Sequence, residues 1–310
     1  IRVGLLWHIS AVSFDIGKNG LISSHDRTFS AQTTPGMASW TARIQNGKPA
    51  SYIFLLKYGE TSTRRKAERT ASELKRLGLE PLIFHDTSEP LLYKTRRTPE
   101  YRPYKVCIKK KFDTRAAAAN YRDAIWNTCE TEVIPYKTSD PAGTIILTNK
   151  ETGQRIQSSR TVVISGSSVT LRDIPVGTGF HWESVENRTY PGDIILSVDE
   201  TGSLTLVNRL PLEDYLKGVV PSEMPAGFPI EALKAQAVAA RSEVLAKLNK
   251  QHKGQPFDIC AGVHCQVYSG LTKQHERSSR AVAETRGQIL MYDGRVADAV
   301  YSAVCGGHTE

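Results

Sequence analysis

The chain opens with the alternation of apolar and polar residues that is typical of β-strands. Residues 1–6 form a short apolar run, and Val12, Phe14 and Ile16 alternate with polar residues. A period of two places every second side chain on the same face of a strand, so these segments predict strands with one buried face. We expect a first sheet to begin here.

The period changes after residue 51. Residues 52–56 form an apolar strand pattern, apolar positions recur at helical spacing from Ala67 to Leu77, and Gly78 is placed to end that helix before a strand at 80–84. The same order then repeats, with a strand at 104–108, Asp113 as the expected N-cap, a helix over 114–127 and a strand at 131–134. Two such β-α-β halves predict a ferredoxin-like βαββαβ module.

Short strand patterns separated by Gly, Asn, Asp and Pro return after Pro141, and residues 200–202 predict a hairpin turn. Because the segments on either side of the module are alike, we interpret 51–137 as an insert in one β-rich domain made of 1–50 and 138–310. The predicted fold class is α+β. The expected strands after the insert lie at 143–148, 162–165, 169–174, 194–198 and 204–207.

Two helices are predicted near the C-terminal end of the chain. Pro211 opens a short one, and a second begins at Pro229 with apolar positions at helical spacing as far as Leu248. Between them, Pro225 disfavours helical geometry at the preceding residue, so we expect Glu223 to lie on a constrained loop.

The composition excludes some classes of protein. Of 310 residues, 40% are hydrophobic and 23% charged, which rules out wholesale disorder, and the apolar runs are too short to span a bilayer. The net charge of +8 favours a polyanionic partner, either nucleic acid, an anionic cell wall or a membrane surface. No aromatic RNA-binding strand or zinc-finger spacing is present, which argues against nucleic acid.

Five cysteines, an odd number in a long chain, do not indicate a disulfide framework, and we expect Cys107 and Cys129 to be core residues. The first residue is Ile1 rather than Met, so we expect the natural start, with any signal peptide or membrane anchor, to be missing.

Six separated motifs between residues 207 and 310 occur in a recognisable order. They are residues 207–216 (VNRLPLEDYL), 221–225 (PSEMP), 231–241 (EALKAQAVAAR), 265–270 (CQVYSG) with 281–287 (AVAETRG), and 305–310 (CGGHTE). Together they closely resemble the stage II sporulation protein D family, also called the amidase-enhancer domain. The resemblance covers residues 140–310 and extends to the opening strand. Members of that family continue beyond the last motif, so we expect the chain to be clipped there.

This resemblance implies a lytic transglycosylase, which cleaves the MurNAc-GlcNAc bond of peptidoglycan and leaves a 1,6-anhydro sugar. Glu223, in the Pro-Ser-Glu-Met-Pro motif, would be the catalytic acid, and its apolar neighbours would raise its pKa by desolvation. One carboxyl suffices for this reaction, whereas an ordinary glycoside hydrolase needs a second. Without the resemblance, Glu223 would be interpreted as capping a turn.

Further residues are candidates for substrate binding. Gln236, Arg241, Gln266 and Tyr268 either contact sugar hydroxyls and the lactyl carboxylate or tie the helices to the sheet. His308, after two glycines that allow close backbone approach, is a further substrate-binding candidate.

A metal site is predicted from four residues, His252, Cys260, His264 and Cys265. Two thiolates and two imidazoles suit tetrahedral zinc, and four protein ligands indicate a structural site. Adjacent ligands at 264 and 265 require a loop rather than a strand. Cys305 or His308 are the alternatives to His252 as the fourth ligand. A Cys260–Cys265 disulfide or two buried free thiols are the alternatives.

The insert resembles the SPOR domain, a module that binds peptidoglycan glycan strands, in element order and size. Lys109–Lys111, Arg96 and Arg97 would face the glycan, and the alternative is an insert with a purely spatial role.

Three functions compete. The first is an extracytoplasmic lytic transglycosylase of the cell envelope. The second is a non-catalytic scaffold that binds the wall and enhances a partner amidase. A zinc hydrolase is disfavoured, because four protein ligands leave the metal no open position.

Overall fold

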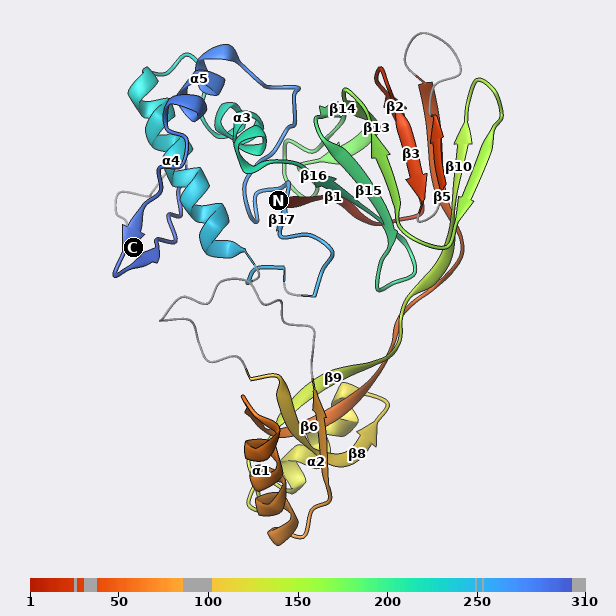
Figure 1. Ribbon diagram of the computed structural model, residues 1–310, viewed down its shortest axis with the longest axis vertical. Coiled ribbons are helices and arrows are strands. Elements are labelled where there is room, and N and C mark those ends of the chain that lie inside the picture. Colours follow the sequence, from red (N-terminus) through yellow and green to blue (C-terminus); the bar gives the residue numbers. More distant parts are fainter. Residues whose placement is uncertain (25–26, 31–37, 86–101, 249, 253, 303–310) are drawn as a thin grey trace. The chain divides into compact units, whose positions relative to one another are not determined.

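The computed structural model describes residues 1–24, 27–30, 38–85, 102–248, 250–252 and 254–302. The chain folds into two compact units (Figure 1). Unit 1 comprises Ile1–Pro49 and Ala142–Glu310, and unit 2 comprises Ala50–Pro141. The insert expected over 51–137 falls within unit 2. The described part of the chain holds no helix that is both long and apolar enough to cross a membrane.

Seven strands of unit 1 form one sheet in the order β17-β1-β16-β15-β12-β3-β4. The first strand is antiparallel to β16 and parallel to β17, where Gly4 lies opposite Cys260. The strand β1 therefore pairs with the short strand that contains Cys260, one of the predicted metal ligands. The bounds are β1 Arg2–Ile9, β3 Leu21–Ser24, β4 Arg27–Ser30, β12 Val162–Ser165, β15 Asp193–Val198, β16 Leu204–Arg209 and β17 Ile259–Cys260.

Six other strands of unit 1 form a second sheet in the order β11-β10-β5-β2-β13-β14. Val12, Phe14 and Ile16 of β2 are all buried, which confirms the alternation seen in the sequence. Unit 2 leaves and rejoins this sheet between β5 and β10, which pair with Lys48 opposite Ala142. The bounds are β2 Ala11–Ile16, β5 Ala38–Lys48, β10 Ala142–Asn149, β11 Arg155–Ser158, β13 Val169–Val176 and β14 Ser184–Tyr190.

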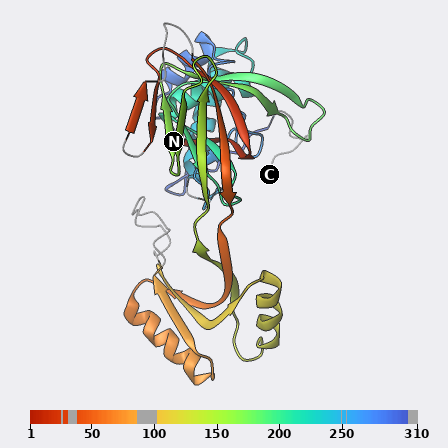
Figure 2. The same ribbon diagram turned by 90° about the vertical axis from the view of Figure 1, so that its right-hand side faces the viewer.

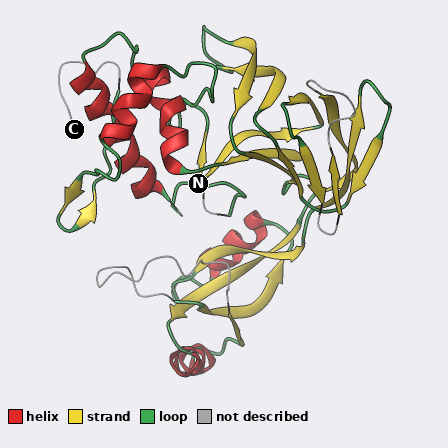
Figure 3. Cartoon of the chain, turned by 45° about the horizontal axis from the view of Figure 1, so that its top comes forward, coloured by secondary structure: helices red, strands yellow, loops and turns green. Residues whose placement is uncertain are grey.

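Three helices of unit 1 lie together on one side of its sheets (Figure 3). They are α3 (Leu212–Glu223), α4 (Ile230–Lys247) and α5 (Glu276–Glu284), followed by the short hairpin of β18 (Met291–Tyr292) and β19 (Arg295–Val296). Apolar side chains from both sheets and all three helices form one core. The observed α+β class is the predicted one.

The turn between β15 and β16 is built around Asp199, and we call it the Asp199 turn. Gly202 has a φ of +80°, which favours glycine, and its Cβ position would lie 2.7 Å from the Lys48 backbone. The Asp199 carboxylate accepts hydrogen bonds from backbone or hydroxyl groups of His8, Thr201, Ser203 and Thr205, at 2.6–3.1 Å. Burial acts to raise the pKa of Asp199, but these bonds outweigh it and lower the pKa to about 2.

Unit 2 has the order strand, helix, strand, strand, helix, strand that the sequence pattern indicates, and its sheet runs β7-β8-β6-β9 with antiparallel neighbours. Figure 2 shows its two helices, α1 in orange at the left and α2 in yellow-green at the right of the unit, with strands between them. The bounds are β6 Ser51–Thr61, α1 Arg64–Arg76, β7 Pro81–His85, β8 Tyr104–Phe112, α2 Arg115–Ala124 and β9 Glu132–Ser139.

The residue that ends α1 is the one expected from the sequence, whereas the N-cap of α2 differs from the expected one. Gly78 follows α1 with a φ of +78°, as expected of a C-terminal glycine. The N-cap of α2 is Thr114 and not Asp113, because the Thr114 hydroxyl accepts the Ala117 N–H at 3.1 Å. Cys107 and Cys129 are buried, as predicted for core residues.

Candidate functional site

Glu223 is the last residue of α3, which corrects the expectation that it lies on a loop. The helix continues through Pro221 because a proline in the last turn removes only one backbone hydrogen bond, and the Ser222 hydroxyl donates to the Gly218 carbonyl at 2.7 Å. The chain leaves the helix at Met224, whose extended φ of −136° is the geometry expected before Pro225.

The segment 266–270 passes directly beside α3 and meets the Glu223 carboxylate. The Val267 N–H donates to Glu223 Oε1 at 2.6 Å, and the Ser222 and Ser269 hydroxyls lie 3.1 Å apart. Gly218 allows this approach, because a Cβ there would lie 2.6 Å from the Gly270 carbonyl oxygen.

The carboxyl of Glu223 is only partly exposed to solvent. Burial raises its pKa and is the largest influence, while the Val267 hydrogen bond opposes the shift. The negative charge of Glu243 raises the pKa further, and the positive charge of Lys273 lowers it. Burial thus favours the protonated form that a general acid needs, as the sequence analysis expected.

Three of the expected substrate-binding residues are buried. The Arg241 guanidinium, 1% exposed, makes two hydrogen bonds to the Glu213 carboxylate at 2.9 and 2.8 Å. Gln266 is bonded to α3 and α4, and the Tyr268 hydroxyl donates to Asn208 at 2.9 Å. Substrate contact by Arg241, Gln266 and Tyr268 stays a prediction. Their contacts fit the alternative that they tie the helices to the sheet.

Gln236 remains a candidate for substrate binding, and Tyr301 joins it. Both residues lie close together, and the charges of Glu223 and Glu243 act on the Tyr301 hydroxyl, whose pKa is raised chiefly by burial. Within the described residues, neither the Gln236 amide nitrogen nor the Tyr301 oxygen makes a hydrogen bond of ordinary geometry. No pattern in the sequence indicates Tyr301, because a single tyrosine has no distinctive spacing.

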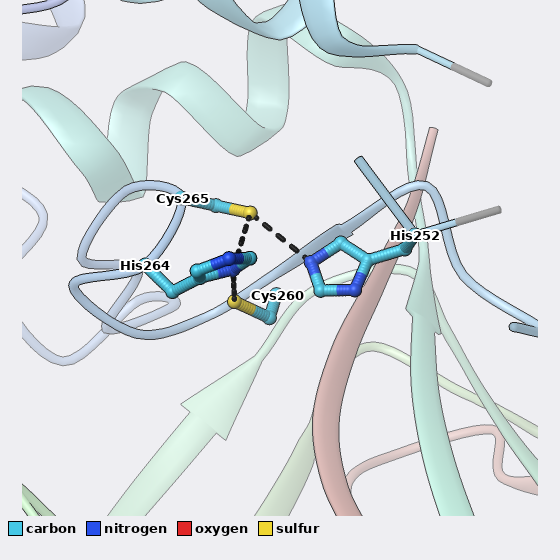
Figure 4. Close-up of side chains that lie close together, drawn as sticks. All are labelled: His252, Cys260, His264 and Cys265. Carbon is cyan, nitrogen blue, oxygen red and sulfur yellow. Dashed lines mark hydrogen bonds between the residues drawn. The ribbon is translucent and has the colours of Figure 1, made fainter. Parts of the chain in front are cut away.

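The four predicted metal ligands converge (Figure 4). The ligand atoms of His252, Cys260, His264 and Cys265 all lie within 4.8 Å of one another. Cys265 Sγ is 3.2 Å from His252 Nε2 and 3.7 Å from His264 Nδ1, which is also 3.7 Å from Cys260 Sγ. Neighbouring ligands of tetrahedral zinc are separated by about 3.3 to 3.8 Å, from the bond lengths of zinc to nitrogen and sulfur. The donor set therefore fits zinc.

The surroundings of the cluster also suit a metal. His264 and Cys265 lie in a turn in which the Cys265 N–H donates to the Gly262 carbonyl, so adjacent residues can both face the cluster. The outer ring nitrogens are engaged, His252 Nδ1 with Gln255 at 2.6 Å and His264 Nε2 with Gln251 at 3.0 Å. Such outer contacts orient metal-binding imidazoles.

The two cysteines of the cluster are free thiols in this structure. Hydrogen bonding from the Cys265 thiol lowers the pKa of Cys260, whereas the same contact raises that of Cys265. Of these two thiols, Cys260 therefore loses its proton first.

Other predicted residues are placed only in part. His308, Cys305, Arg96 and Arg97 lie outside the described residues. The lysines of 109–111 are exposed on β8, where Lys109 pairs with Glu80 at 2.9 Å. Lys110 lies 3.8 Å from the centre of the Tyr121 ring.

The comparisons with known proteins identify the class of unit 1. Residues 200–292 match the family model described as Stage II sporulation protein, and they contain α3, α4, Glu223 and all four members of the cluster. The match of residues 200–292 to this family confirms the resemblance inferred from the motifs.

Three individual relatives are similar to parts of this chain. An uncharacterized protein of Brachyspira hyodysenteriae is 36% identical over 162 residues, 49% of this chain and 44% of that protein. The amidase enhancer of Bacillus subtilis is 40% identical over 95 residues, 31% of this chain and 12% of that protein. Stage II sporulation protein D of Bacillus subtilis is 33% identical over 182 residues, 52% of this chain and 47% of that protein. The matches thus cover less than half the length of each of these relatives.

One solved structure, a putative exported protein of Burkholderia pseudomallei, matches with a TM-score of 0.25 and 12% identity over 57% of this chain and 30% of that chain. A score this low supports no conclusion about the fold.

Proposed function

We propose that unit 1 is a peptidoglycan lytic transglycosylase of the cell envelope and that Glu223 is its single catalytic acid and base. The observation that carries the proposal is the Glu223 carboxyl itself. It is partly exposed at the end of α3, its pKa is raised by burial, and a backbone N–H holds one of its oxygens. Such a group is protonated closer to neutral pH than an ordinary carboxyl.

The chemistry requires two proton transfers at one carboxyl. Protonated Glu223 donates its proton to the glycosidic oxygen as the bond to the anomeric carbon breaks. The carboxylate then accepts the proton of the sugar's own 6-hydroxyl as that oxygen attacks the same carbon. The products are a free hydroxyl on one sugar and a 1,6-anhydro ring on the other, and no water is consumed.

A second carboxylate near Glu223 does not change this assignment. Glu243 is 4% exposed, and its two oxygens are bonded to Lys247 and Gln266. A hydrolase of the usual kind needs a carboxylate that reaches the anomeric carbon or its attacking water. Glu243 is enclosed by its partners, which favours the reaction with a single acid.

The test is digestion of purified peptidoglycan, with 1,6-anhydro products measured by mass spectrometry. Glu223→Gln keeps the size of the side chain and removes the acid, so product formation should fall by at least about 100-fold. Glu231→Gln is the matched control, since its side chain is 77% exposed on α4. Wild-type product formation should persist in the control. Full activity in Glu223→Gln would defeat the assignment.

A second candidate function follows from the relative named amidase enhancer. In this alternative, the chain binds the wall without cleaving it and stimulates a partner amidase. Release of stem peptides by an added amidase, with no anhydro sugar formed by the wild-type protein alone, favours this function. We also propose that unit 2 is a SPOR-like wall-binding module, and pelleting of the protein with the same peptidoglycan measures that binding.

We further propose that His252, Cys260, His264 and Cys265 hold one structural zinc ion. With four protein ligands, zinc would supply folding stability and no open position for chemistry. Elemental analysis should find about one zinc per chain. Cys260→Ser should lose the metal and melt at a lower temperature, whereas Cys129→Ala, a cysteine of unit 2, should keep it. A folded wild-type protein that carries no metal contradicts the proposal.

A further inference from the structure

Glu243 is a buried carboxylate to which the reaction above gives no role. It lies on α4 with 4% of its surface exposed. Its Oε2 accepts a hydrogen bond from Gln266 Nε2 at 2.7 Å, and its Oε1 pairs with Lys247, one turn further along the helix. Burying a charge costs free energy unless hydrogen bonds or an opposite charge compensate it, and here Gln266 and Lys247 provide that compensation.

The partner Gln266 is fixed on every side. Its Oε1 accepts the hydroxyl proton of the fully buried Tyr215 at 3.1 Å, and its Nε2 also donates to the Ala240 carbonyl at 3.0 Å. The amide therefore has one orientation, with a donor pointing at Glu243. An apolar side chain at position 243 would leave that donor unpaired.

The next residue along the chain binds the proposed catalytic acid. The Val267 N–H donates to Glu223 Oε1 at 2.6 Å. A continuous path therefore leads from Glu243 through the Gln266 side chain and one peptide unit to Glu223. The orientation of the Val267 N–H that donates to Glu223 therefore depends on the hydrogen bond between Gln266 and Glu243.

We propose that Glu243 is a positioning residue for Glu223: it anchors the Gln266–Val267 segment and places a second negative charge beside the catalytic carboxyl. This inference rests on the proposed function of Glu223 and deepens it. A negative charge near a carboxyl disfavours its ionisation, so the Glu243 carboxylate keeps Glu223 protonated to higher pH.

The charged and titratable groups around the pair come from several elements. Lys247 on α4 compensates Glu243 in part, and Lys273 acts on Glu223 with the opposite sign. Tyr301 interacts with both carboxyls, and Tyr215 interacts with Glu243. Among these groups, the negative charge of Glu243 raises the pKa of Glu223 and the positive charge of Lys273 lowers it.

Two substitutions distinguish the two effects of Glu243, which are the anchoring of Gln266 and the negative charge near Glu223. Glu243→Gln keeps an oxygen acceptor for Gln266 and removes the charge, so the pKa of Glu223 should fall by about half a unit. Glu243→Asp keeps the charge but shortens the reach, so kcat should fall about tenfold while the pKa of Glu223 stays near its wild-type value. A residue with a purely structural role would change the melting temperature and neither of these quantities.

The primary measurement is a carbon-13 NMR titration of glutamate side-chain carboxyls in the full chain, with Glu223 assigned by its loss in Glu223→Gln. This measurement does not depend on activity, so failure of the proposed function and failure of this inference are distinguishable. The pH profile of kcat/KM is the second measurement, and its alkaline limb should move to lower pH in Glu243→Gln. Glu231→Gln, on the same helix, should leave both unchanged.

Lys247→Met keeps the test decisive if Glu243→Gln does not fold. Removing the compensating cation should raise the pKa of Glu223 rather than lower it. An unchanged Glu223 titration in Glu243→Gln and in Lys247→Met overturns the inference.

Discussion

Asp199 and Glu223 are both carboxylates withdrawn from water in the same unit, and burial has opposite outcomes at the two positions. The Asp199 turn supplies donors from four residues, and the pKa of Asp199 falls to about 2. Glu223 receives one backbone donor, and its pKa rises. The number of donors aimed at a buried carboxylate thus decides whether it becomes a fixed anion or a usable acid.

The largest expected effect that tests this comparison is on the stability of the Asp199 turn. Asp199→Ala leaves donors of His8, Thr201, Ser203 and Thr205 without their acceptor, and the Thr205 hydroxyl among them is buried, so it should lower the free energy of unfolding of unit 1 by about 3 kcal/mol. Urea unfolding monitored by tryptophan fluorescence measures this. Glu231→Gln should stay within about 0.5 kcal/mol of the wild type. An equally small change in Asp199→Ala would show that the donors contribute little.

A smaller effect is expected on the acid side of the stability profile. The pKa of Asp199 is lowered on folding, so its contribution is complete above the unfolded value of 3.8 and is lost as the pH falls toward about 2. The stability difference between the wild type and Asp199→Asn should therefore shrink from pH 5 to pH 2. Melting temperatures of both proteins across this range provide the measurement, and a constant difference contradicts the shift.

The smallest effect is expected at Glu223, with the opposite sign. The pKa of Glu223 is raised above its ordinary value of 4.5, so ionisation costs stability, and this cost appears as the pH rises from about 4.5 through the folded value. Glu223→Gln should match the wild type near pH 4 and be slightly more stable at pH 7. A variant that is less stable than the wild type at pH 7 would indicate that the Val267 hydrogen bond outweighs burial.

Local patterns in the sequence predict many elements of the fold. The alternation at 12–16, the glycine after α1, the turn at 200–202 and the start of α4 at Pro229 are all found as expected. Each depends on a few consecutive residues, for which the preferred backbone geometry is set locally.

The prediction failed where distant residues decide the structure. Glu223 belongs to α3 because that helix packs against the segment 266–270, and Gly218 permits the close approach. Arg241 is buried because it meets Glu213, 28 positions earlier in the chain. Such pairings have no signature in a single sequence, so the same residue types were equally compatible with substrate binding.

The candidate site was predictable to different degrees. The cluster of His252, Cys260, His264 and Cys265 was found because its ligands lie within 14 residues and have the chemistry of a zinc site. Glu223 was named as a candidate through its motif. Glu243 was not found, because its partner Gln266 is 23 residues away and only the fold brings them together.

The register of β5 and β10 has a consequence for how this chain is assembled. Lys48 and Ala142, which flank unit 2 in the sequence, are cross-strand partners. The two strands are therefore paired in register up to the point where unit 2 begins and ends. A tight hairpin could join the two strands at that point without moving any residue of the sheet. In topological terms, the whole of 50–141 occupies the place of a loop, and a gene could gain or lose it without disturbing the sheet that flanks it.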